Sequence, residues 1–161
     1  MTRSEGLSFL PACGARDYDR AKALFLEYAR SLSFNLCFQD FDAELPGIAT
    51  MYGGPHGGII LAKDDQAGDF VGCVGIRRVD DRTAELKRMY VREAYRNRGL
   101  GSVLLDRAVQ LARELGYRRV RLDTMPTMTR AITLYRAYGF KEIEPYRYNP
   151  EPGALFFELD L

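Results

Sequence analysis

The sequence predicts an α+β fold in a single domain, residues 1–161. Two apolar runs, 59–62 and 69–76, flank a polar turn at 64–68 and predict an antiparallel hairpin. Further along, strand-like segments alternate with two segments whose apolar residues recur every three or four positions, the spacing of a helix. Antiparallel strands followed by strand–helix–strand–helix–strand–strand predict helices packed around a mixed sheet.

Length and composition fit one globular domain. A chain of 161 residues can bury about 70% of the surface that it exposes when unfolded. Apolar residues make up 47% and charged residues 28%, and the formal net charge is +1. So small a charge gives no broad positive field, and therefore neither nucleic acid nor a membrane is an expected partner. Basic residues gather only locally, at 87–98 and 118–121, which suits a small anionic ligand.

Cysteine and histidine usage argues against disulfides and metal. Cys13, Cys37 and Cys73 are far apart and form no Cys-x-x-Cys pair, which favours a reducing compartment. The single His56 leaves no histidine-based metal cluster. The N-terminus lacks a signal-peptide pattern, and no apolar run approaches the length of a membrane span. We expect a cytoplasmic protein without a metal.

The N-terminal third predicts a strand and one or two helices. Residues 7–10 form a strand candidate ended by Pro11, and Asp17 is the candidate N-cap of a helix. The apolar positions of this helix are Ala21, Leu24, Phe25, Tyr28 and Leu32. A second short helix fits within 33–58, where Pro46-Gly47 breaks the apolar pattern. The glycine-rich stretch 53–58 is interpreted as a connection into a strand, because no helix signal and no nearby Arg or Lys accompany it.

The second half of the sequence predicts strands that alternate with helices. The expected elements are a strand at 83–91, a helix at 101–115 capped by Gly116, a strand at 120–124 stopped by Pro126, a helix at 128–138 ended by Gly139, a strand at 140–143, a loop at 145–153 and a last strand from 155.

A basic, glycine-containing turn joins the strand at 83–91 to the following helix. Its sequence is Arg96-Asn97-Arg98-Gly99-Leu100-Gly101, with Arg92 just upstream. A helix N-terminus presents unpaired N–H donors and partial positive charge, and glycines let an anion approach that backbone closely. The turn therefore predicts a diphosphate site. A Walker A loop is excluded because no lysine follows either glycine, and a dinucleotide fingerprint because its third glycine is missing.

Arg-x-x-Gly-x-Gly after a strand resembles the acyl-CoA-binding signature of the GNAT superfamily of N-acetyltransferases. Leu134-Tyr135, Gly139-Phe140 and the closing strand extend the resemblance from about Thr83 to the end of the chain. It implies a GNAT-like mixed, mostly antiparallel sheet of about six to seven strands with helices on both faces. It also implies that the strands at 83–91 and 119–124 run parallel and splay apart, with the co-substrate acetyl-CoA in the gap. The residues implied to bind it are Met89, Tyr90, Val91, Arg96, Asn97, Arg98, Gly99, Leu100, Gly101 and Ser102.

The resemblance also suggests two catalytic residues for direct attack of a neutral amine on the thioester. Glu85 is the candidate base, although residues two apart share a strand face, so that it can equally form an ion pair with Lys87. Tyr135 is the candidate acid, because a phenol with a pKa near 10 can donate to a thiolate; its apolar spacing also fits core packing. Met128 stands where many family members carry an Asn that contacts the cofactor arm, which puts that contact in doubt.

The predicted activity is transfer of an acetyl group to a primary amine of a small-molecule or peptide acceptor. A non-catalytic acyl-CoA-binding or sensing module is the alternative. A homodimer is compatible with the sequence. Acceptor specificity is expected from the N-terminal helices and the loop at 145–153, where the available side chains are Phe34, Phe38, Gln39, Asp40, Phe41 and Glu44, and Tyr146, Arg147, Tyr148 and Asn149.

Overall fold

The computed structural model describes residues 5–32 and 41–161, and in them the strands form one seven-stranded sheet of order β1-β2-β3-β4-β5-β7-β6. The strands are β1 (Leu7–Pro11), β2 (Gly58–Asp64), β3 (Phe70–Arg78), β4 (Thr83–Val91), β5 (Arg119–Thr124), β6 (Lys141–Ile143) and β7 (Leu155–Asp160). The β4–β5 pair is parallel, and the other adjacent pairs are antiparallel. The predicted mixed, mostly antiparallel sheet is thus confirmed, including the β2–β3 hairpin.

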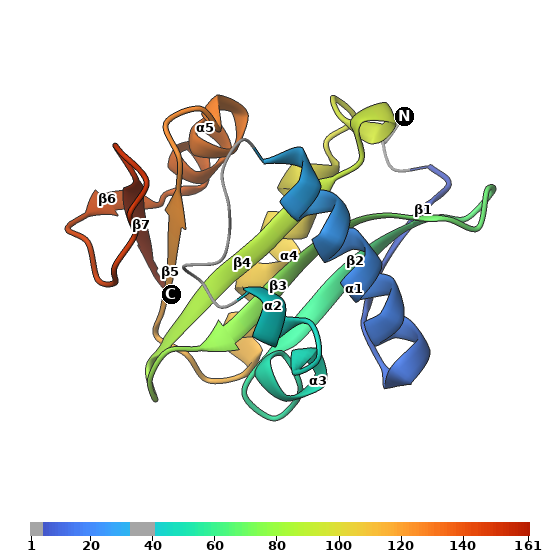
Figure 1. The fold of residues 1–161 in the computed structure, drawn as a ribbon, viewed down its shortest axis with the longest axis horizontal. Coiled ribbons are helices and arrows are strands. Elements are labelled where there is room, and N and C mark those ends of the chain that lie inside the picture. The colour runs from blue at the N-terminus through green and yellow to red at the C-terminus, as the bar shows by residue number, and fades with distance from the viewer. Residues whose placement is uncertain (1–4, 33–40) are drawn as a thin grey trace.

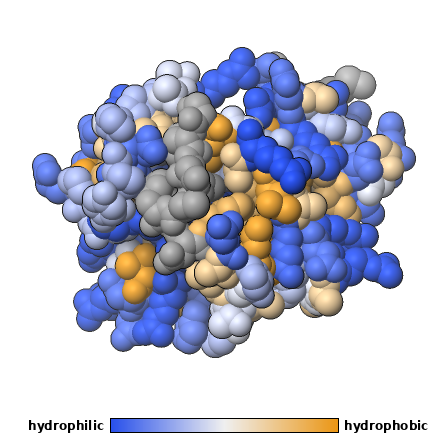
Figure 2. Space-filling view, in the orientation of Figure 1, coloured by the Kyte–Doolittle hydropathy of each residue, from blue (hydrophilic) through white to orange (hydrophobic). Residues whose placement is uncertain are grey.

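Helices cover both faces of the sheet (Figure 1). On one face lie α1 (Gly14–Ser31), α2 (Phe41–Glu44) and α3 (Ile48–Met51), and on the other α4 (Leu100–Glu114) and α5 (Thr129–Tyr138). A 3₁₀ turn, η2 (Glu93–Tyr95), lies between β4 and α4. Figure 2 shows the α1–α3 face, where hydrophilic residues dominate and hydrophobic residues reach the surface mainly near α1. In the described parts of the chain, no helix has both the length and the apolar character needed to cross a membrane.

Each face has its own apolar core. Leu104, Leu105 and Ala108 of α4 pack with Ile132 and Tyr135 of α5 against one side of the sheet. On the other side, Ala21, Leu24 and Phe25 of α1 pack with Ile48 and Tyr52. Of the five apolar residues expected in α1, Ala21, Leu24 and Phe25 are buried, Tyr28 is partly buried, and Leu32 is the partly buried C-cap.

The start of α1 corrects the predicted N-cap. The helix begins at Gly14, three residues before Asp17. Instead of capping the first turn, Asp17 lies inside it, and its Oδ2 accepts a hydrogen bond from the backbone N–H of Cys13 at 2.9 Å. The carboxylate thus pairs with the backbone N–H of the N-cap residue from the fourth helical position.

Two short helices, α2 and α3, stand on either side of Pro46-Gly47 where one was expected. The part of that prediction that falls on 33–40 lies outside the described residues. Residues 53–57 connect α3 to β2, as the interpretation of the glycine-rich stretch required.

Strand β4 is irregular at its centre and diverges from β5. Lys87 lies opposite Gly75 and Tyr90 opposite Cys73, so two residues of β4 face one of β3. The bulge includes Arg88, whose φ is +58°, an uncommon backbone conformation for a side-chain-bearing residue. Pairing with β5 stops at Glu85. The predicted splay between the two parallel strands therefore begins at residue 86.

Candidate active site

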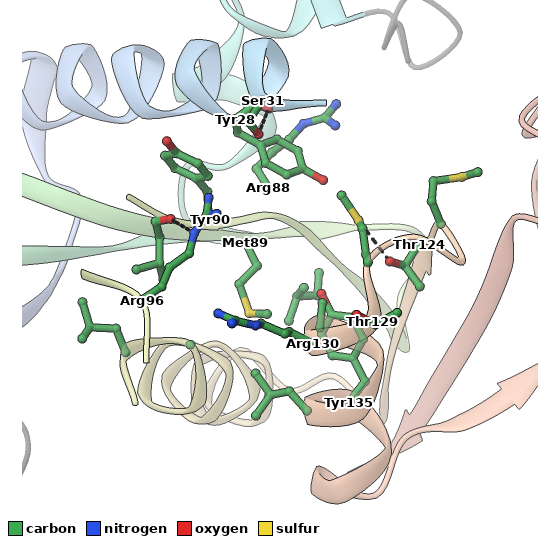
Figure 3. Close-up of a pocket in the computed structure, with 18 of the residues that line it drawn as sticks. Tyr28, Ser31, Arg88, Met89, Tyr90, Arg96, Thr124, Thr129, Arg130 and Tyr135 are labelled. Carbon is green, nitrogen blue, oxygen red and sulfur yellow. Dashed lines mark hydrogen bonds between the residues drawn. The ribbon is translucent and has the colours of Figure 1, made fainter. Parts of the chain in front are cut away.

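A cavity of about 890 Å³ occupies the gap where β4 and β5 separate. Figure 3 shows its walls: Tyr28 and Ser31 of α1 on one side, Arg88–Tyr90 of β4 along its length, and Thr129, Arg130 and Tyr135 of α5 opposite. Cavities of this size hold substantial organic ligands. The cavity is continuous from the glycine turn to the β4 bulge.

Most of the predicted cofactor-binding residues line this one cavity. Nine of the ten do so, namely Met89, Tyr90, Val91, Arg96, Asn97, Gly99, Leu100, Gly101 and Ser102. Arg98 is absent from the lining, and its guanidinium lies 5.0 Å from the ring centroid of Tyr95. Tyr135 lines the cavity, and Glu85 does not.

The glycine turn has the backbone of an anion site. Asn97 and Gly99 both have positive φ angles, +65° and +83°, and Gly99 is the N-cap of α4. Alternating backbone conformations of this kind turn successive N–H groups toward one concavity. A Cβ at Gly99 would meet no protein atom within 4 Å, and one at Gly101 would make only an ordinary contact, 3.5 Å from a Leu134 methyl. Packing thus leaves open space above both glycines.

Gly101 leaves space beside the helix start but does not form the bend. It lies inside the first turn of α4, without a positive φ, so the chain bends at Asn97 and Gly99 instead. The absence of a side chain at Gly101 matters for access to the helix N-terminus, not for the turn.

The arginines contribute less to this site than their sequence positions suggest. Arg92, expected to add charge at the turn, forms a bidentate ion pair with Glu27 of α1, at 3.0 and 2.7 Å. The Arg96 Nε donates to the backbone carbonyl of Val91 at 2.9 Å, across the end of β4. Arg92 is thus engaged by α1, while Arg96 lines the cavity with its Nε bonded to the β4 backbone.

Glu85 lies in a buried ionic network rather than in the cavity wall. Its carboxylate contacts Arg77 of β3 and Arg147 of the β6–β7 loop, both at 3.0 Å, and Lys87 at 3.7 Å, and it accepts a 2.6 Å hydrogen bond from the Tyr146 hydroxyl. Burial alone would raise its pKa, but the three cations and the hydroxyl hold that pKa at about 2. So acidic a carboxylate is a poor proton acceptor at neutral pH. The geometry favours the ion pair with Lys87 over the predicted base role.

A second buried network fixes the bulge. The Arg88 guanidinium donates to both carboxylate oxygens of Glu44 in α2, at 2.8 and 3.2 Å, and the Tyr52 hydroxyl donates to the same carboxylate at 2.9 Å. Glu44 is fully buried and Arg88 nearly so. Fully paired, this network joins α2 to β4 at the wall of the cavity.

Tyr135 and Met128 stand on the α5 side. The Tyr135 ring packs against Phe140 and Phe157, and burial raises the pKa of its phenol well above 10, so that it stays protonated at neutral pH. Met128 lines the cavity as the N-cap of α5 and makes no side-chain capping bond, while its sulfur accepts a 3.3 Å hydrogen bond from Thr124.

Several residues near Glu85 and Asp123 were not identified as a group from the sequence. Tyr146 and Arg147 reach Glu85 from 61 and 62 positions away, and Asn149 donates to Asp123 at 3.1 Å. No local spacing connects such distant positions. Of the candidates for acceptor binding, Tyr148 is 78% exposed, and Phe34, Phe38, Gln39 and Asp40 lie outside the described residues.

The gap between β4 and β5 beside the start of α4 is the arrangement that the resemblance to the GNAT superfamily implied. The family model of the acetyltransferase (GNAT) family matches residues 21–140. The chain is 37% identical to an uncharacterized N-acetyltransferase of Schizosaccharomyces pombe over 100% of its own length and 99% of the relative's. An uncharacterized N-acetyltransferase of Dictyostelium discoideum is 26% identical over 86% of this chain and 92% of the relative. The protein therefore belongs to the GNAT family of acetyltransferases.

Solved structures agree on the fold. An acetyltransferase from Streptococcus agalactiae superposes with a TM-score of 0.78 at 24% identity, covering 98% of this chain and 99% of that one. A GNAT family acetyltransferase from Elizabethkingia anophelis, solved with acetyl-CoA bound, superposes with a TM-score of 0.67 at 22% identity over 98% and 99% of the two chains.

Proposed function

We propose that this enzyme transfers the acetyl group of acetyl-CoA directly to a primary amine of a small-molecule or peptide acceptor in the cytoplasm. One observation carries the proposal: a single cavity runs from the Asn97–Gly101 cradle, along the unpaired edge of β4, to the buried ionic groups at the bulge. A long thioester and an amine can thus meet in one continuous cavity.

The chain's residues have distinct parts in this reaction. Backbone N–H groups at Gly99–Gly101 hold the diphosphate, each charged hydrogen bond contributing about 1.5–3 kcal/mol. Beyond Glu85, β4 offers backbone groups to an extended arm as a strand edge does. Tyr135, protonated and at the cavity wall, is the proposed donor to the leaving thiolate.

The acceptor end is built for a polar molecule. Asp123 and Asn149 line it from β5 and the β6–β7 loop, and Tyr28 lines it from α1. Burial raises the pKa of Tyr28 to about 12, so its hydroxyl is a hydrogen-bonding group and not a charge at neutral pH. These groups can position an amine-bearing acceptor by hydrogen bonds.

The test is thiol release from acetyl-CoA with a panel of amino acids, polyamines, aminoglycosides and peptides. Transfer predicts free thiol and an acceptor heavier by one acetyl group, seen by mass spectrometry. CoA binding by calorimetry without thiol release from any amine would instead identify the non-catalytic acyl-CoA-binding module. Absence of both would contradict the diphosphate site at Gly99–Gly101.

A further inference from the structure

Asp123 lies where the sheet opens, on the face that α1 covers. Its neighbour in β5, Leu122, packs into the core beneath α4, and successive residues of a strand point to opposite faces. Asp123 is also two residues beyond Arg121, which pairs with Glu85 at the last paired position of β4 and β5. A co-substrate held at the start of α4 would therefore reach the gap from one face, and Asp123 borders the gap from the other.

The carboxylate of Asp123 is buried but forms part of the cavity wall. Its side chain is 7% exposed, and it lines the same cavity as the glycine turn. Tyr28 enters this cavity from α1 (Figure 3). Burial chiefly raises the pKa of Tyr28, and the negative charge of Asp123 adds to the effect, so this charge acts on the α1 wall. Asp123 therefore faces the space that an acceptor would occupy.

The contacts of Asp123 with described residues all go to one oxygen, Oδ2. The Asn149 Nδ2 donates a hydrogen bond to it at 3.1 Å, and the Arg147 Nε lies 3.8 Å away, beyond hydrogen-bonding distance. Arg147 is engaged elsewhere, because its Nη1 donates to both oxygens of Glu85 at 3.0 Å. An amide carries no charge. The one ion-pair contact of Asp123 among the described residues is therefore long and shared.

The second oxygen of this carboxylate, Oδ1, is open. Within residues 5–32 and 41–161, no protein group bonds it. The one fully buried side-chain nitrogen or oxygen without a partner in these residues is the Arg119 Nε, so Oδ1 is not sealed in the protein and borders the cavity. A buried carboxylate is costly unless a cation pairs with it. Oδ1 is thus placed to receive a cationic group from a ligand.

We propose that Asp123 binds the ammonium group of the acceptor, and that the acceptors are primary alkylamines with no carboxylate on the carbon that carries the amine. This inference rests on the acetyl transfer proposed above. An alkylammonium offers three donors to the open Oδ1, whereas a carboxylate beside the amine would lie against the charge of Asp123. Arg88 and Arg147 are held by Glu44 and Glu85, so neither guanidinium is free to pair with such a carboxylate.

Asn149 is a positioning residue in this scheme. Its Oδ1 accepts a hydrogen bond from the backbone N–H of Glu151 at 3.0 Å, which directs its Nδ2 toward Asp123. Held by Oδ2, the carboxylate presents its other oxygen to the cavity before an acceptor arrives. Binding the ammonium then requires no rearrangement of the wall, which favours affinity.

The first experiment ranks acceptors of the full chain by kcat/KM for thiol release from acetyl-CoA. The panel of polyamines, aminoglycosides, peptides and amino acids is extended by matched pairs, each an amino acid and the amine that remains without its carboxyl group: tyrosine and tyramine, phenylalanine and phenethylamine, leucine and isopentylamine. We expect the best acceptor to be an amine without an adjacent carboxylate, and each amine that reacts to exceed its amino acid by about 10-fold or more. A free amino acid acetylated at its α-amine as the best acceptor would overturn the inference.

The second experiment removes the charge and keeps the shape. Asp123→Asn retains an oxygen that can accept the bond from Asn149, and with the best panel amine its KM should rise by about 10-fold or more. The kcat at saturating amine and the CoA affinity by calorimetry should stay within about 3-fold, which also shows that the variant folds. Asp123→Glu keeps the charge and should recover part of the lost affinity. Asp19→Asn, at a carboxylate of α1 that is 76% exposed and outside the cavity, is the matched control and should behave as the parent.

The possible outcomes separate this inference from the proposed function. A parent enzyme that acetylates amines while Asp123→Asn keeps the KM of the parent would overturn the role of Asp123 alone. A joint fall of kcat and CoA affinity in Asp123→Asn, without the selective rise in KM, would assign Asp123 to holding the loop at 145–153 and would also overturn its role toward the acceptor. A parent enzyme that binds CoA but acetylates no amine would end the proposed function, and the role of Asp123 with it.

Discussion

The two ends of the cavity are built on different principles. At the glycine turn, one continuous segment, Arg96–Gly101, supplies the site, and of its residues only Arg98 is absent from the cavity lining. At the bulge, buried charges from α2, β3, β4 and the β6–β7 loop meet through their side chains. Changes at the turn should therefore alter ligand affinity, and changes at the bulge should alter stability and pH dependence.

Removing Glu44 should have the largest effect on stability. Glu44→Ala leaves the Arg88 guanidinium buried without its partner and deprives the Tyr52 hydroxyl of its acceptor. Breaking a buried ion pair this way costs about 3–5 kcal/mol in the free energy of unfolding, measurable by urea denaturation. Asp42→Ala, an exposed carboxylate on the same short helix, should stay within about 0.5 kcal/mol of the parent. Equal losses in both variants would refute the special role of the buried pair.

The acid dependence of stability tests Glu85. Its folded pKa of about 2 lies below its ordinary value of 4.5, so its stabilisation is complete above pH 4.5 and is lost as the pH falls toward 2. The shift corresponds to roughly 3 kcal/mol. We expect Glu85→Gln to be less stable than the parent at pH 6 and to approach it near pH 2.5, by urea denaturation at each pH.

A matched comparison for this titration is Glu142→Gln, an exposed carboxylate on β6. Its difference from the parent should be small at both pH values, since exposed pairs contribute only about 0–1 kcal/mol. A pH-independent difference for Glu85→Gln would mean that the carboxylate is not held ionised by its three cations.

Substitutions at the turn should act on CoA affinity. Gly99→Val places a β-branched residue at a φ of +83° and fills the open space above the helix start. Left-handed backbone alone costs about 1–2 kcal/mol for such a residue, and we expect CoA binding to weaken by at least about 10-fold in calorimetry. Arg96→Ala removes an exposed side chain and should weaken the binding free energy of CoA by about 0–1 kcal/mol.

Gly68→Val separates backbone strain from loss of the site. Gly68, in the β2–β3 turn, has a φ of +77° and no atom within 4 Å of an added Cβ, like Gly99, but lies outside the cavity. The Gly68→Val variant should lose about as much stability as Gly99→Val but should bind CoA as tightly as the parent.

Weaker CoA binding in Arg96→Ala than in Gly99→Val would show that side-chain charge, not backbone, holds the diphosphate.

The contrast between the two ends also decides what the sequence could predict. The glycine turn is local, so its position, its helix start and nearly all of its lining residues followed from a short pattern. The hairpin and the parallel β4–β5 pair followed from apolar spacing and resemblance. The predicted start of α1 at Asp17 was three residues too late, because a carboxylate in the first turn and one at the N-cap cannot be told apart in the sequence.

The network of charged side chains near the β4 bulge could not be predicted in the same way. Glu85 and Lys87 were read as neighbours on one strand face, but the number of cations around that carboxylate depends on Arg77 and on Arg147, 62 positions away from Glu85. The protonation state of Glu85 depends on this count, since each additional cation lowers the pKa of the carboxyl group.

Met128 offers the smallest change and the finest test of the CoA end. As the N-cap of α5 it makes no side-chain capping bond, and Asn is among the preferred N-cap residues. Met128→Asn should stabilise the protein by about 0.5–2 kcal/mol in urea denaturation. One added hydrogen bond in the cavity is worth about 0.5–1.5 kcal/mol, or roughly 2–10-fold in CoA affinity. Met128→Leu keeps the apolar volume without polar atoms and should produce neither gain. A gain in stability without a gain in affinity would mean that the side chain at position 128 caps α5 but does not reach the ligand, so that the backbone of the glycine turn and of β4 accounts for the binding of CoA.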